Sequence, residues 1–206
     1  MNSKTHLACG VAASLVLLRP AAMEGIFLAV IGGSVGGVLP DIDLLSNSRR
    51  SEILPSQVSA LWLSAVLLAA DCFLHTGICT AVMTRDRTAV LLGAAMFVTL
   101  GVIGALTAHR TFTHSLVGCL LFSLSVRIFC PLFLPAFAAG FSSHLVLDLL
   151  NHKKVRLFYP TRAGLCFNLC RSDGPVDSFL FFFCAALSLF CLFFGVMTGA
   201  KGITLF

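Results

Sequence analysis

The stretch from residue 132 to residue 151 reads LFLPAFAAGFSSHLVLDLLN, an apolar segment that ends in two ionisable side chains. About 20 apolar residues are what an α-helix needs to cross a hydrocarbon core of about 30 Å. His144 and Asp148 are four positions apart, so on a helix their side chains lie on one face, within reach of a shared ion. The stretch therefore predicts a membrane helix whose end contributes to a metal site.

The composition of the whole chain predicts an integral membrane protein. Of its 206 residues, 58% are hydrophobic and only 11% are charged, and the mean hydropathy is +0.97. A soluble domain has roughly twice this charged fraction. No polar stretch is long enough to form a separate domain, so we expect one membrane domain over residues 1–206.

The expected fold is all-α, a polytopic membrane bundle of about seven apolar helices. The apolar segments run over about 6–18, 21–39, 57–79, 88–107, 113–130, 132–151 and 178–199, with Pro20, Pro40, Pro55 and Pro131 among the breaks. A polar, basic loop over about 152–177 precedes the last segment. The first segment is short, and it also has features of a signal peptide, since Lys4 precedes about a dozen apolar residues. We expect this segment to remain in the mature protein, because cleavage would remove His6.

Alternating these helices across a bilayer places every candidate ligand at one membrane surface. The first helix begins, the second and fourth end, the fifth begins and the sixth ends at that surface. These five places hold His6, Asp41 with Asp43, His109, His114, and His144 with Asp148.

The basic residues divide unevenly between the two surfaces. The surface with the candidate ligands carries nine, namely Lys4, Arg49, Arg50, Arg110, Lys153, Lys154, Arg156, Arg162 and Arg171. The opposite surface carries five, namely Arg19, Arg85, Arg87, Arg127 and Lys201. The positive-inside rule then makes the ligand-bearing surface cytoplasmic.

Local sequence suggests how the side chains are aimed. Pro40 disfavours helix at the preceding residue, so we expect extended backbone through Asp41 and Asp43, with both carboxylates on one side. His109 and His114 are five apart, which requires a loop or a helix start between them. Thr111 or Thr113 is the expected cap of the following helix.

Mixed imidazole and carboxylate ligands favour zinc, manganese or iron over calcium, with zinc the first choice and one or more ions bound. Each such residue alone is more simply an interfacial polar group, but ionisable residues inside membranes are costly and tend to be functional.

Two lesser candidates are Asp71 with His75 at the opposite surface, and Cys166 with Cys170 as a thiolate site. Gly32–Gly37 is better explained by close helix packing than by phosphate binding.

The order of these motifs resembles the YdjM-like family of inner-membrane metal-dependent hydrolases. The resemblance rests on His6, LPDID at 39–43, HRTFTHS at 109–115, His144 with Asp148, and Tyr159-Pro160. A weaker similarity in motif style extends to zinc-dependent phospholipase C and related zinc nucleases. Leu44, Thr111 and Asn151 depart from the family pattern, in which histidine, glycine and threonine are common at these positions.

The resemblance implies a bacterial or archaeal cytoplasmic-membrane protein. Its metal-site positions would be His6, Asp41, Asp43, His109, His114, His144 and Asp148. We expect hydrolysis of a phosphoester in a membrane lipid or lipid-linked substrate, with Asp41 or Asp43 as general base and Arg110 stabilising transition-state charge. Substrate contacts are expected from Arg110, Thr113, Ser115, Asn151 and His152. No nucleic-acid partner is expected. The alternative is a non-catalytic scaffold or regulatory protein, in which the metal only ties helix ends together.

Overall fold

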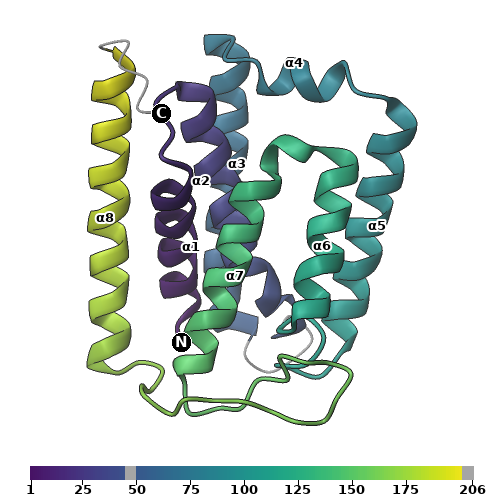
Figure 1. Cartoon of the computed structure of the whole chain (residues 1–206), viewed down its shortest axis with the longest axis vertical. Coiled ribbons are helices and arrows are strands. Elements are labelled where there is room, and N and C mark those ends of the chain that lie inside the picture. Colours follow the sequence, from purple (N-terminus) through teal and green to yellow (C-terminus); the bar gives the residue numbers. More distant parts are fainter. Residues whose placement is uncertain (45–49, 201–206) are drawn as a thin grey trace.

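The computed structural model describes residues 1–44 and 50–200 as a bundle of helices that run alternately up and down (Figure 1). The long helices are α1 (Ser3–Leu18), α2 (Met23–Val38), α3 (Arg50–Leu74), α5 (Arg87–Leu106), α6 (Leu116–Phe129), α7 (Leu134–Leu150) and α8 (Pro175–Ala200). Three short helical pieces connect them, namely η1 (Leu39–Leu44), α4 (Ile78–Met83) and η2 (Pro131–Phe133). Residues 1–44 and 50–200 contain no β-strand, only two isolated bridges in the loop before α8. The all-α expectation is therefore confirmed.

Five segments of the described chain are long and apolar enough to cross a membrane. They are Met23–Leu44, Ile53–Leu74, Arg87–Leu106, Pro131–Leu150 and Pro175–Thr198. Helices α1 and α6 are apolar but have only 16 and 14 residues, fewer than the roughly 17 that a full span needs. Within residues 1–44 and 50–200, five helices are thus candidates to span a membrane and two apolar helices are shorter, so the expected count of about seven is not confirmed.

Helix α2 lies at the centre of the bundle, and its glycines let its neighbours approach closely. A Cβ atom built at Gly32 would lie 2.6 Å from Ala136 Cβ and 2.9 Å from Phe137 N of α7. A Cβ atom at Gly37 would lie 2.7 Å from the carbonyl oxygen of His6 in α1. The expected packing role of Gly32–Gly37 is confirmed, and this packing brings the ends of α1, α2 and α7 together.

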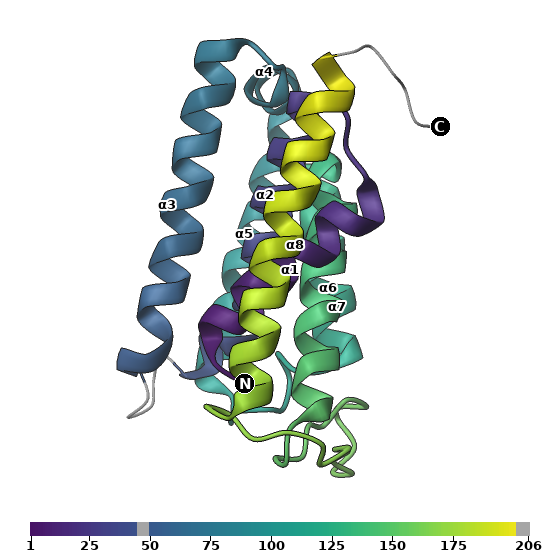
Figure 2. The same ribbon diagram turned by 90° about the vertical axis from the view of Figure 1, so that its left-hand side faces the viewer.

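Large apolar side chains cover the outer faces of α3, α5 and α8, with α3 forming one side of the bundle (Figure 2). Trp62 of α3 is 69% exposed and Phe182 of α8 is 68% exposed. Such surfaces suit contact with lipid. Of the basic residues counted above, Arg49 and Lys201 lie outside the described residues.

The loop between α7 and α8 folds back across the lower end of the bundle in Figure 1. Val155 and Leu165 exchange two backbone hydrogen bonds of 2.8 Å, and Leu116 N at the start of α6 donates to Leu157 O at 3.0 Å. Arg156 N also donates to Arg110 O at 3.1 Å. The basic loop is thereby attached to the segment that carries His109 and His114.

Candidate metal centre

The structure brings all seven expected ligands to one end of the bundle. They come from the first turns of α1, from η1, from the loop between α5 and α6, and from the last turns of α7. Six of the seven are at most 5% exposed, namely His6, Asp41, Asp43, His114, His144 and Asp148. The side chain of His109 is 25% exposed.

Four of these side chains point at a common centre, Asp41, His114, His144 and Asp148. His114 Nε2 lies 3.2 Å from His144 Nε2, 3.3 Å from Asp148 Oδ2 and 3.5 Å from Asp41 Oδ1. His144 Nε2 lies 3.7 Å from Asp41 Oδ1 and 3.9 Å from Asp148 Oδ2. Nitrogen and oxygen ligands around a tetrahedral zinc ion stand about 3.4 Å from one another. We call these four residues the inner cluster, and the five distances above lie around that value. At this end of the described chain, the groups whose ligand atoms all lie within 4.8 Å of one another are Asp41, Asp43, His109 and His114, and His6, His144 and Asp148.

His144 is held in a form that can donate an electron pair to an ion. Its Nδ1 donates to the carbonyl oxygen of Gly37 at 2.8 Å, so the lone pair of a neutral ring is on Nε2, which faces the inner cluster. The His6 ring stacks on the His144 ring, with centroids 3.8 Å apart. His6 Nε2 also lies 3.5 Å from Asp148 Oδ1. His6 therefore borders the inner cluster as a further nitrogen ligand or as a support for His144.

Asp43 lies behind His114 and contacts a different set of groups. Its Oδ2 accepts from Arg110 N at 3.1 Å and Thr113 Oγ1 at 3.0 Å, and lies 3.2 Å from His114 Nδ1. Its Oδ1 lies 2.8 Å from His109 Nδ1. A carboxylate on the far nitrogen of a histidine orients the ring and raises its basicity as a metal ligand.

The geometry around Asp41 and Asp43 corrects the expectation of an extended backbone. Residues 39–44 form the 3-10 helix η1, and Leu39 continues α2 with φ −59° and ψ −40°. Pro40 is tolerated there because the first residues of a helical turn need no N–H donor. The two carboxylates consequently face different partners. Asp41 faces the inner cluster, whereas Asp43 contacts His109 and the far side of the His114 ring.

The loop between α5 and α6 re-aims His109 and His114, as expected. The cap of α6 is Ser115, however, rather than Thr111 or Thr113, because the Ser115 Oγ accepts from Gly118 N at 3.0 Å. Ser115 Oγ also donates to Phe112 O at 2.6 Å. Thr113 and Ser115, both expected to contact substrate, are fully buried and bonded within the protein.

Charged groups of both signs meet at the centre. The carboxylates of Asp41, Asp43 and Asp148 lie together. Arg110 Nη2 donates to Asp148 Oδ1 at 3.1 Å, and the Met1 ammonium nitrogen lies 3.5 Å from the same oxygen. Burial by itself would lower the pKa of His114, but hydrogen bonds to Asp41 and Asp43 raise that pKa to about 10. The two carboxylates thus favour the protonated, cationic form of the His114 ring.

Sequence reasoning missed several contacts of this centre. Arg110 Nη1 donates to the carbonyl oxygen of Lys153 at 2.6 Å, which ties the centre to the basic loop. Ser3 lines a cavity of about 50 Å³ together with Asp41, His109, Arg110 and Asp148. The basic excess of the loop signalled Lys153, but nothing in the sequence pattern signalled Ser3 or the carbonyl group of Gly37.

Asp71 at the other end has a structural role in the described chain. Its carboxylate accepts from Ile78 N at 2.9 Å and Cys79 N at 2.7 Å, which satisfies the first turn of α4. Asp71, Cys72 and Cys79 are also close enough to hold an ion, whereas the expected partner His75 is not in this group. In the loop, burial raises the pKa of the Cys170 thiol, which disfavours the thiolate form that a metal site needs.

These features define a helical membrane protein with two adjacent histidine–aspartate groups at one end that could each hold a metal ion. The chain belongs to the YdjM inner membrane protein family, whose model matches residues 1–202. This match confirms the resemblance drawn from the motifs. No match is found among the curated proteins or among the solved structures.

Proposed function

We propose that the chain is a membrane-embedded metal-dependent hydrolase that cleaves a phosphoester of a lipid or lipid-linked substrate at the cytoplasmic interface. The observation that carries the proposal is the inner cluster beside the cavity of about 50 Å³, which Asp41, His109, Arg110 and Asp148 line. This volume has room for at least one water molecule. The candidate ligands, a space for water and the positively charged Arg110 therefore occur at one place.

Asp41, His114, His144 and Asp148 are the proposed ligands. Their oxygens and nitrogens lie 3.2–3.9 Å from His114 Nε2 or His144 Nε2, which suits a tetrahedral ion, and two imidazoles with two carboxylates suit zinc, with manganese or iron as alternatives. A bound ion of this kind would lower the pKa of its water and neutralise phosphoryl charge. The YdjM family assignment supports the membrane setting, and the basic loop beside the site supports a cytoplasmic face.

Among the expected ligands, we assign His109 and Asp43 to proton transfer. His109 Nδ1 lies 2.8 Å from Asp43 Oδ1, and the His109 side chain is the partly exposed member of the group, at the cavity wall. A carboxylate that holds one ring nitrogen leaves the other free to exchange a proton with water. Asp43 then acts through His109 rather than as the general base itself.

Arg110 is the proposed cation for substrate oxygens. Its two Nη atoms donate to Asp148 Oδ1 and Lys153 O, and its Nε has no hydrogen-bond partner within residues 1–44 and 50–200. A buried donor of this kind is costly unless a ligand completes it. Its position at the cavity supports a role in binding anionic substrate.

The second candidate function is a non-catalytic scaffold whose ion ties helix ends together. The complete burial of His114 and His144 favours it, because structural metal sites are closed. The water-sized cavity favours catalysis, because catalytic sites keep an open coordination position.

The test begins with metal analysis of detergent-purified protein from metal-supplemented cells. We expect stoichiometric metal in wild type and a strong loss in Asp148→Asn. A screen of lipid phosphoesters should then find turnover that a chelator abolishes and zinc restores. Bound metal without cleavage of any phosphoester in the screen would favour the scaffold.

A further inference from the structure

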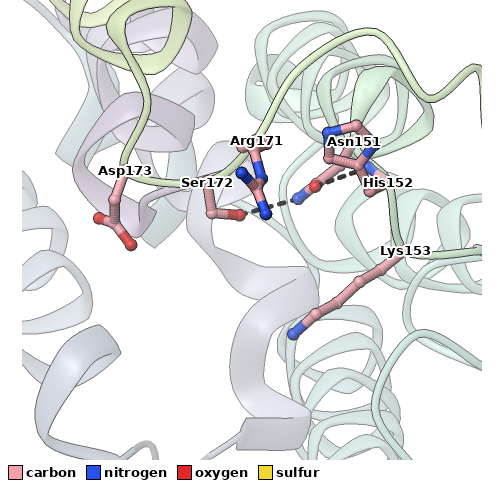
Figure 3. A pocket seen from close by; sticks show the side chains of 6 residues that line it. All are labelled: Asn151, His152, Lys153, Arg171, Ser172 and Asp173. Atoms are coloured by element: carbon pink, nitrogen blue, oxygen red, sulfur yellow. Dashed lines mark hydrogen bonds between the residues drawn. The ribbon is translucent and has the colours of Figure 1, made fainter.

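A second, larger pocket lies beside the metal centre, and its lining residues are drawn in Figure 3. It has a volume of about 590 Å³ and is lined by Asn151, His152, Lys153, Arg171, Ser172 and Asp173. We call it the outer pocket. Its walls are the two ends of the loop between α7 and α8, which meet below the last turn of α7 (Figure 1).

Hydrogen bonds hold the two walls of the outer pocket together. Asn151 is 3% exposed, and its Nδ2 donates to Ser172 Oγ at 2.9 Å, while its Oδ1 accepts from His152 N at 2.7 Å. Cys170 N donates to Leu150 O at 3.0 Å. The charged side chains of the pocket are thus mounted on a fixed frame, which lowers the entropic cost of binding a ligand.

The outer pocket adjoins the cavity of the metal centre. Lys153 and Ser172 line both spaces. The Arg110 guanidinium joins them directly, since it donates to Asp148 on one side and to the Lys153 carbonyl on the other. On the cavity side, the buried Ser3 Oγ has no hydrogen-bond partner within the described chain. A ligand held at the inner cluster can therefore extend into the outer pocket.

The charge of the outer pocket favours an anion. It contains Lys153 and Arg171 against one acidic residue, Asp173. Residues 151–174 carry five basic residues and one acidic residue. Within residues 1–44 and 50–200, neither Lys153 nor Arg171 makes an ion pair. Two uncompensated cations with serine and asparagine groups nearby are the chemistry that binds phosphate.

We propose that the outer pocket binds a second phosphoryl group, so that the substrate of this site is a diphosphate. This inference rests on the proposed function, because it places the scissile phosphoryl group at the inner cluster. A phosphate monoester would occupy the inner cavity, which Lys153 also lines, and leave Arg171 without an anion. A diphosphate satisfies both sites at once, with Arg110 between them.

The test measures binding to metal-loaded, detergent-purified protein by titration calorimetry with four probes. The probes are phosphate, pyrophosphate, geranyl monophosphate and geranyl diphosphate. We expect each diphosphate to bind at least about tenfold more tightly than its monophosphate, the effect of one charge-assisted contact. Metal content measured again after each titration excludes extraction of the ion by the diphosphates.

Three variants locate the effect. Arg171→Ala should weaken diphosphate binding about tenfold and leave monophosphate binding unchanged, because Arg171 lines only the outer pocket. Lys153→Ala should weaken the binding of both, because Lys153 lines both spaces. Arg162→Ala is the matched control, because this exposed arginine lies in the same loop but does not line the outer pocket. Equal losses in Arg162→Ala and Arg171→Ala would indicate general attraction to the basic loop and overturn the proposal.

The geranyl probes distinguish the source of the diphosphate. A lipid-linked substrate predicts that geranyl diphosphate binds more tightly than pyrophosphate, whereas equal affinities indicate a soluble diphosphate. Selective diphosphate binding without turnover would retain the outer pocket and refute the hydrolase. Turnover of monophosphate and diphosphate esters with equal KM and equal affinity would retain the hydrolase and refute the outer pocket.

Discussion

Replacing Asp43 by asparagine tests whether this residue orients His114 or binds the ion itself. Asparagine keeps the shape of the side chain but replaces one oxygen by an NH2 group. That group must then face either His109 Nδ1, now 2.8 Å from Oδ1, or the donors Arg110 N and Thr113 Oγ1 at 3.1 and 3.0 Å from Oδ2. At least one charge-assisted hydrogen bond is lost in either orientation.

The expected magnitude follows from those contacts. A hydrogen bond to a charged group contributes about 1.5–3 kcal/mol, and a residue that orients a metal-bound histidine typically changes metal affinity about 10–100-fold. Asp43→Asn should therefore weaken zinc binding by about this factor while leaving one ion bound at saturation. Asp148→Asn, which removes a proposed ligand, should reduce the stoichiometry itself.

The assay is zinc competition with a chelator of known affinity, combined with elemental analysis of the saturated protein. Asp173→Asn is the matched control, because Asp173 is exposed and lies outside the inner cluster. Its zinc affinity should equal that of wild type. The reasoning is refuted if Asp43→Asn abolishes stoichiometric zinc while Asp148→Asn retains it.

Three further predictions concern catalysis, packing and topology. His109→Gln should keep bound zinc but reduce turnover about 10²–10⁴-fold, as for loss of a general base; parallel losses of zinc and turnover would make His109 a ligand. Gly32→Ala should lower the free energy of unfolding in detergent by about 1–3 kcal/mol through overpacking against α7. Gly101→Ala should be neutral or slightly stabilising in the same measurement, because its Cβ would lie 3.6 Å from the nearest side chain; equal destabilisation would contradict the packing argument. In intact cells, a membrane-impermeant maleimide should label a single-cysteine variant retaining Cys72 but not one retaining Cys166; the reverse pattern would invert the topology.

The parts of the molecule that were predictable from sequence are those that depend on helix parity and helix periodicity. The spacing of His144 and Asp148 determined their common face, and the alternation of apolar segments determined that distant motifs meet at one end. The residue spacing is local, and the alternation of helices only requires counting the apolar segments along the chain. Neither required knowledge of how the helices pack.

The parts that sequence reasoning missed depend on where two backbones come close. The turn at Asp41 and Asp43 became helical because Leu39 continues α2, which outweighed the local preference before Pro40. The division of the two carboxylates between the inner cluster and His109 follows from that turn. Ser115 rather than a threonine caps α6 because α6 begins at Leu116, later than the apolar run suggested.

The glycines of α2 connect the packing of the bundle to the chemistry of the site. The close approach at Gly37 places the α1 backbone against α2, and the Gly37 carbonyl oxygen accepts the Nδ1 proton of His144. The same residue is therefore part of the helix contact and, through its carbonyl oxygen, of the hydrogen bond that directs His144 Nε2 toward the inner cluster. Because of this shared position, a shift of α1 or α7 against α2 must also move a proposed metal ligand. The orientation of the site is consequently set by helix packing within the bundle, and the exposed loop contributes the charges that surround it.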